Sequence, residues 1–134
     1  MIGVVVDTSA YSAFRRGHQG VVPVLQADVP VVLTPIVLGE LRAGFLLGTR
    51  ATQNEALLQV FLAKVRVSLV DITEATATCF AAIRAGLVRA GTPLPMNDVW
   101  IAASAMEHGL RVLTLDAHFL KVPQVLVEYV GGAA

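Results

Sequence analysis

Four acidic residues stand where folding could bring them together: Asp7, Glu40, Asp98 and Asp116. Asp7 and Asp116 directly follow short runs of β-branched and aliphatic residues, which are typical of buried strands. Carboxylates are rarely buried without a partner, and their hard oxygen atoms suit Mg²⁺ or Mn²⁺. An ion held by three or four of them would acidify a water molecule that can attack a phosphorus atom. The four acids therefore predict a site for a divalent metal ion.

Each acid taken alone also has a purely structural explanation. Asp7 and Asp116 could each cap the helix or turn that follows. Asp98 could interact with a helix dipole and share a cap with Asn97, while Glu40 could lie on a solvated helix face. Neither Glu40 nor Asp98 has a suitably placed basic residue within its own helix, so a divalent cation is the simplest way to balance the charge. The coincidence of four such acids favours the metal site, in which Asp116 has the weakest case as a ligand.

Strand and helix patterns alternate along the whole chain. Short apolar runs predict strands over residues 2–6, 31–33, 67–70, 111–115 and 125–127. Helical spacing and capping residues predict helices over residues 8–15, 21–27, 35–47, 52–64, 74–90 and 97–108. Strands separated by helices form parallel βαβ units, so we expect an α/β fold, a three-layer α/β/α sandwich with a mostly parallel central sheet.

The predicted sheet would gather the acids at one edge. In an open parallel sheet, ligands bind beyond the carboxyl ends of the strands, where Asp7 and Asp116 should both lie. Asp98 opens the late helix and shares a face with Ile101 and Ala105, which should point to the core. We therefore expect Asp98 to point inward, toward the same edge.

Composition limits the class of protein. The chain has 134 residues, of which 55% are hydrophobic and 15% charged, and this favours one domain over residues 1–130 with a frayed tail at 131–134. Ten basic residues balance ten acidic ones, which argues against a large basic surface for nucleic acid. The single cysteine, Cys79, excludes a disulfide framework and a thiolate zinc site. We expect a cytoplasmic protein, because the sequence shows neither a signal peptide nor a membrane helix.

The stretches around the acids also carry a family resemblance. Residues 5–9, 38–41, 97–105 and 113–119 together resemble the PIN-domain superfamily and, within it, the VapC-type toxins of toxin–antitoxin modules. The resemblance covers nearly the whole chain. It implies an endoribonuclease that depends on Mg²⁺ or Mn²⁺, hydrolyses RNA phosphodiester bonds with metal-activated water, is inhibited by a cognate antitoxin protein, and forms a homodimer.

The same resemblance assigns roles to individual residues. The acidic quartet of the family matches Asp7, Glu40, Asp98 and Asp116, of which Asp7, Asp98 and Asp116 would bind the metal. Polar residues that orient the acids match Thr8, Ser9 and Thr114. The three histidines, His18, His108 and His118, are expected to be structural or exposed, because none forms a ligand pair at helical spacing.

Other Asp-centred α/β proteins fit the sequence less well. A haloacid-dehalogenase-type phosphatase needs a second aspartate two residues after the first, where Ser9 stands. A receiver-like signalling domain needs paired acids after the first strand and a lysine after the last one, but Asp7 has no acidic neighbour and Lys121 is poorly placed. A catalytically inactive PIN-like module that binds RNA or protein stays as the alternative.

The apolar content exceeds what a small core easily buries. It predicts a dimer surface and an antitoxin groove along the helices at 35–47 and 52–64.

Overall fold

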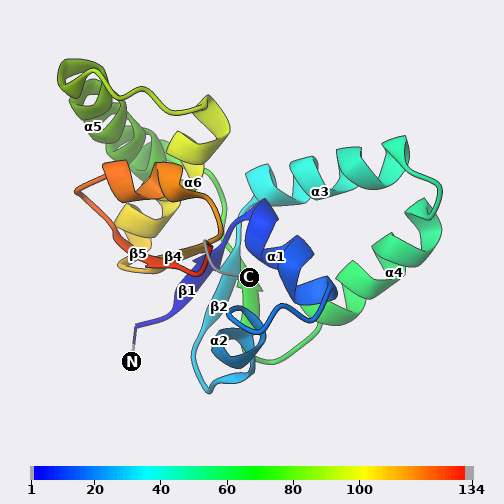
Figure 1. Cartoon of the computed structure of the whole chain (residues 1–134). Helices are drawn as coiled ribbons and strands as arrows, with labels where there is room; N and C mark the ends of the chain where they lie inside the picture. Colours follow the sequence, from blue (N-terminus) through cyan, green and yellow to red (C-terminus); the bar gives the residue numbers. More distant parts are fainter. Residues whose placement is uncertain (1, 132–134) are drawn as a thin grey trace.

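A five-stranded, all-parallel sheet forms the centre of the computed structural model, which describes residues 2–131 (Figure 1). The strands are β1 (Val4–Val6), β2 (Val31–Leu33), β3 (Val67–Leu69), β4 (Arg111–Thr114) and β5 (Leu126–Tyr129). Their order is β3-β2-β1-β4-β5, so the chain winds outward from β1 to β3 and then returns to the other side of β1. The winding reverses between β1 and β4, and parallel sheets bind ligands at such a point.

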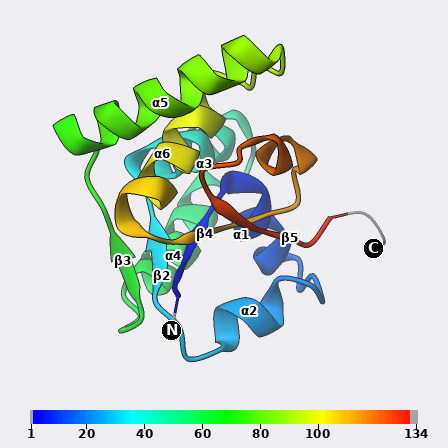
Figure 2. The ribbon, with the colours of Figure 1, turned by 90° about the vertical axis from the view of Figure 1, so that its left-hand side faces the viewer.

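Helices cover both faces of the sheet. The helices are α1 (Thr8–Arg15), α2 (Val22–Gln26), α3 (Pro35–Leu47), α4 (Ala51–Leu62), α5 (Glu74–Ala90) and α6 (Met96–His108), and a short 3-10 helix, η1 (Ala117–Lys121), follows β4. In Figure 1, α5 and α6 lie on the left of the sheet and α1 on the right, while α3 and α4 form a hairpin that projects to the right. Figure 2 shows α5 crossing the upper part of the molecule over α6. This arrangement confirms the predicted α/β/α fold.

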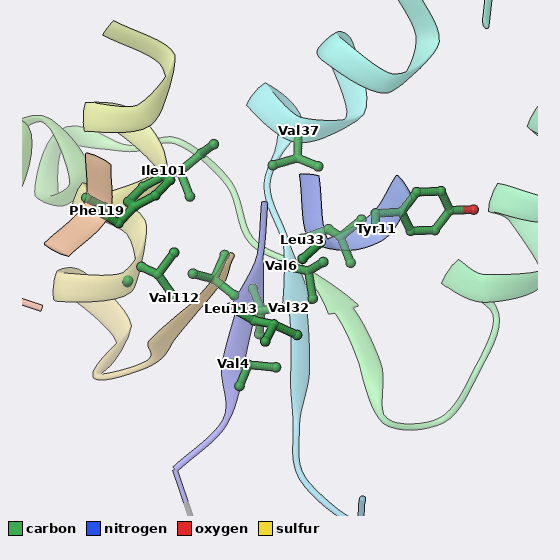
Figure 3. Packing of buried hydrophobic residues seen from close by; sticks show 14 of the residues in the cluster. Val4, Val6, Tyr11, Val32, Leu33, Val37, Ile101, Val112, Leu113 and Phe119 are labelled. Atoms are coloured by element: carbon green, nitrogen blue, oxygen red, sulfur yellow. The ribbon is translucent and has the colours of Figure 1, made fainter. Parts of the chain in front are cut away.

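The core is built around β1, whose three valines are each 0% exposed. Figure 3 shows Ile101 and Phe119 packed on one side of the sheet and Tyr11 on the other. The Tyr11 ring meets Phe61 of α4 edge-on, with 5.2 Å between the ring centroids. Burial on both faces explains why β1 and β2 are continuous apolar runs rather than alternating patterns.

Capping residues set the helix ends, as the sequence predicted. The Thr34 hydroxyl accepts a hydrogen bond from the Val37 amide at the start of α3, and Thr73 forms a capping box at the start of α5. Gly91 and Gly109 end α5 and α6 with φ values of 71° and 64°, a conformation that costs glycine little.

Several predicted bounds were wrong by one or two residues. The first strand begins at Val4 rather than residue 2, because pairing with β2 starts at Val4 and Ile2 is exposed. The last strand runs on to Tyr129, which pairs with Thr114. Of the predicted tail, Gly131 is half-buried, and residues 132–134 lie outside the described residues. None of the helices within residues 2–131 is long and apolar enough to cross a membrane.

Candidate metal centre

Asp7 lies directly beyond β1 and is only 4% exposed. Its Oδ1 accepts hydrogen bonds from the Ala10 amide at 2.8 Å and from the Ser9 hydroxyl at 2.7 Å, and its Oδ2 accepts one from the Thr114 hydroxyl. Asp7 therefore caps α1, which is the structural role that the sequence also allowed for it. Its hydrogen bond with Thr114 links β1 to β4. Burial raises the pKa of Asp7, although the hydrogen bonds from Thr114, Ala10 and Ser9 lower it in part.

Ser9 and Thr114 connect Asp7 to the segment after β4. The Leu115 amide donates to the Ser9 hydroxyl at 3.1 Å, and the Asp116 amide donates to the Thr114 hydroxyl at 2.8 Å. Ser9 and Thr114 thus contact Asp7 directly and hold the backbone of Asp116 beside it. This is the arrangement expected of residues that orient a metal ligand.

Glu40 reaches the same place from α3. Its Oε1 accepts a hydrogen bond from the Thr8 hydroxyl at 2.7 Å, and its Oε2 accepts one from the Asn97 amide group at 3.3 Å. Thr8 therefore orients Glu40 rather than Asp7. Sequence reasoning considered Asn97 only as a capping residue, because its contact with Glu40 spans 57 positions of the chain.

Asp98 lies in the first turn of α6, and its side chain is 18% exposed. Ile101 and Ala105, on the same face, are each 1% exposed, so the face points inward as predicted. Burial and, in decreasing order, the negative charges of Asp116, Asp7 and Glu40 together raise the pKa of Asp98 to about 6, although His118 lowers it in part. The effect of all three charges on Asp98 shows that the four acids share one electrostatic environment.

Asp116 follows β4, and its side chain is 36% exposed. Its Oδ1 accepts a hydrogen bond from the His118 amide at 2.9 Å, so it caps η1. The His118 Nδ1 lies 3.2 Å from that same Oδ1 and 3.7 Å from the Asp98 Oδ2. His118 is half exposed, as expected of the histidines, but its contact with two of the acids was missed. His118 stands two positions after Asp116, which is not a helical spacing, so the sequence pattern carried no signal for this contact.

One cleft of about 290 Å³ collects these side chains at the carboxyl edge of the sheet. Its lining consists of the residues Asp7, Thr8, Ser9, Ser12, Glu40, Asp98, Ile101 and Asp116. The structure thus brings all four predicted acids and two of the three predicted polar companions to one surface, while Thr114 lies fully buried behind Asp7.

The donor set of this cleft suits a divalent metal ion. Four carboxylates face it, and within residues 2–131 no lysine or arginine forms an ion pair with any of them. His118 is the only basic side chain of that segment within ion-pair distance of the acids. The raised pKa values of Asp7 and Asp98 show that negative charge at this place is costly without a cation.

The pKa of Asp98 leads to a prediction about the metal-free protein. The pKa of Asp98 is higher in the folded state than in the unfolded chain. Between about pH 4 and 6 the folded protein therefore still holds the Asp98 proton, whereas the unfolded chain has lost it. The contribution of Asp98 to stability thus falls as the pH rises through this range. Asp98→Asn should therefore raise the free energy of unfolding in chelator at about pH 7.5 by roughly 1–3 kcal/mol. Below about pH 4 the two proteins should differ little.

Urea denaturation at both pH values measures this difference, with Asp28→Asn as the control at an exposed aspartate that precedes β2. A variant that is less stable than the parent at neutral pH in chelator would show that Asp98 is a structural partner rather than a repelled charge.

Comparison with known proteins agrees with this geometry. Residues 4–125 match the family model described as the PIN domain. Ribonuclease VapC4 of Mycobacterium tuberculosis is 34% identical over 92 residues, which are 69% of this chain and 71% of that protein. Ribonuclease VapC5 of the same organism is 30% identical over 117 residues, which are 86% of this chain and 84% of that protein.

A solved structure is similar over almost the full length. The crystal structure of DNA-bound VapBC from Salmonella typhimurium matches with a TM-score of 0.82 and 26% identity, covering 96% of this chain and 98% of that chain. These findings confirm the predicted resemblance and the predicted enzyme class, a metal-dependent nuclease. The chain belongs to the PIN-domain family and, within it, to the VapC ribonucleases.

Proposed function

We propose that this chain is an endoribonuclease dependent on Mg²⁺ or Mn²⁺ that acts in the cytoplasm as the toxin of a toxin–antitoxin pair. The observation that carries the proposal is the convergence of Asp7, Glu40, Asp98 and Asp116 on one cleft at the point where the sheet reverses its winding. RNA is the proposed substrate because two relatives that match most of the chain are named ribonucleases.

Asp7, Asp98 and Asp116 would hold the metal ion. When bound, the ion supplies an acidified water molecule and a positive charge for the phosphate. Thr114 and Ser9 fix the carboxylate of Asp7 through hydrogen bonds, which keeps its geometry constant during the reaction.

Glu40 would act as the proton acceptor. Thr8 and Asn97 each donate a hydrogen bond to one of its two oxygens, which turns the carboxylate into the cleft from α3. Each oxygen keeps further lone-pair capacity, so Glu40 can accept a proton from the reacting water molecule. Glu40 is half-buried, so fewer water molecules can reach its carboxylate, while a substrate in the cleft still can.

A hollow on the α3–α4 hairpin is the proposed site for the antitoxin. The hollow is about 430 Å³ in volume and is lined by Arg42, Phe45, Leu46, Ala51, Thr52 and Glu55. Arg42 and Glu55 form an ion pair at 3.1 Å across it. An apolar floor with a charged rim suits an amphipathic segment of a protein partner, and the structural relative from Salmonella typhimurium is a VapBC complex.

The exposed apolar side chains along the same hairpin form the proposed dimer surface. Leu47 at the end of α3 is 90% exposed, and Leu57 and Val60 of α4 are also exposed. Exposed large apolar side chains favour burial against a second copy of the chain, and the hairpin that carries them projects from the rest of the molecule (Figure 1).

The cleavage activity gives the first test. With Mg²⁺ or Mn²⁺ and a pool of RNA oligonucleotides, the parent chain should cut, while Asp7→Asn and Asp98→Asn should each lose activity by about a hundredfold or more, because each removes a charged ligand. Asp28→Asn, on an exposed residue before β2, should cut like the parent. If both site variants cut as well as the parent, the proposal that these acids bind the catalytic metal is wrong. If the parent itself cuts no RNA, the result supports the inactive binding module instead.

Sedimentation measures the assembly. The purified chain should sediment as a dimer at high concentration, and Leu47→Glu should shift it toward monomer because a charge would have to be buried in the contact. Val88→Glu, on an exposed position of α5, is the matched control and should leave the dimer unchanged. A parent chain that remains a monomer at high concentration would contradict the dimer.

A further inference from the structure

His118 is the one basic residue at the acidic cleft within residues 2–131, and the proposed chemistry of the four acids does not use it. Its Nδ1, rather than Nε2, points at the acids, at 3.2 Å from Asp116 and 3.7 Å from Asp98. The three groups offer ligand atoms that all lie within 4.8 Å of one another. An imidazole nitrogen with two carboxylates is a common donor set for a divalent transition metal.

Two independent contacts hold His118 at this place. The Asp116 carboxylate accepts the His118 amide hydrogen, so the turn at the start of η1 directs the residue back toward Asp116. The next residue, Phe119, is 0% exposed and packs near Ile101 of α6, as Figure 3 shows. Because Asp98 lies one turn before Ile101 on the same face, this anchor keeps η1 beside the Asp98 carboxylate.

The distances fit coordination by a single ion. Ligand atoms about 2.1 Å from a metal lie about 3.0 Å apart at an octahedral edge and about 3.4 Å apart at a tetrahedral edge. The two nitrogen–oxygen distances, 3.2 Å and 3.7 Å, are close to this range. The ligand atoms of Asp98, Asp116 and His118 all lie within 4.8 Å of one another, so small movements of the imidazole ring and of the two carboxylates would bring all three to bonding distance of one ion.

We propose that His118 binds the metal ion directly through Nδ1, together with Asp98 and Asp116, and that it makes this centre select Mn²⁺ over Mg²⁺. The inference rests on the proposed metal centre and adds to it a nitrogen ligand and a choice of ion. Imidazole nitrogen is a poor ligand for Mg²⁺, which prefers oxygen and keeps its waters, whereas first-row transition metals accept it readily.

A simple ion pair between His118 and Asp116 would give the same contacts, so the test must detect a metal–nitrogen bond. Electron spin echo spectroscopy of bound Mn²⁺ does so, because a coordinated imidazole nitrogen adds a hyperfine modulation that carboxylates and water do not produce. The parent chain, His118→Gln and His108→Gln are compared. His108 is the matched control, since it also faces a carboxylate, Glu107 at 3.5 Å, at the far end of α6.

The nitrogen modulation should be present in the parent and in His108→Gln and absent in His118→Gln. Calorimetric titration should show that His118→Gln weakens Mn²⁺ binding by about tenfold and Mg²⁺ binding by less than about threefold. The variant should fold normally because the side chain is half exposed.

Failure of the inference about His118 can be told apart from failure of the proposed function. Bound Mn²⁺ without nitrogen modulation in the parent, or modulation that persists in His118→Gln, overturns the role of His118 and leaves the acidic centre intact. A parent chain that binds neither Mn²⁺ nor Mg²⁺ overturns the inference and the proposed function together.

Discussion

The hydrogen bond between Asp7 and Thr114 links the two strands on which the site depends. Asp7 ends β1 and Thr114 ends β4, and these neighbours mark the reversal of the sheet. The other oxygen of Asp7 caps α1, so one buried carboxylate fixes a strand end, a helix start and the adjacent strand. The Thr114 hydroxyl also accepts the amide hydrogen of Asp116. The positions of two acids are therefore set by contacts inside the protein, before any ligand binds.

The remaining acids are brought to this point against their mutual repulsion. Burial and the charges of the other three acids raise the pKa of Asp98, which shows the cost of the arrangement. The core maintains it, because α6 is held by buried residues such as Ile101 and Ala102, and α3 by Val37 and Leu41. These apolar contacts do not depend on the state of the carboxylates. A cation that neutralised the cleft would relieve the repulsion, and its binding would then stabilise the folded state.

The fold could be predicted from sequence because β1 and α6 carry strong local signals: a continuous apolar run before Asp7 and a consistent buried face beside Asp98. The edge at which the acids meet followed from the rule for parallel sheets. Side-chain contacts between distant elements could not be predicted in this way. Asn97 meets Glu40 because α3 and α6 pack together, and His118 meets Asp98 because a short turn folds over α6. No periodicity in the sequence encodes such contacts.

The central claim is that the cleft lined by the four carboxylates binds a metal ion, and anomalous diffraction from crystals soaked in Mn²⁺ tests it most directly. The structure predicts an anomalous peak in the cleft, about 2.2 Å from carboxylate oxygens of Asp7 and Asp98. Crystals of Asp98→Asn should show a much weaker peak there. An ordered cleft with no peak after soaking, or a peak only at other acidic residues such as Glu55 or Glu128, would contradict the claim.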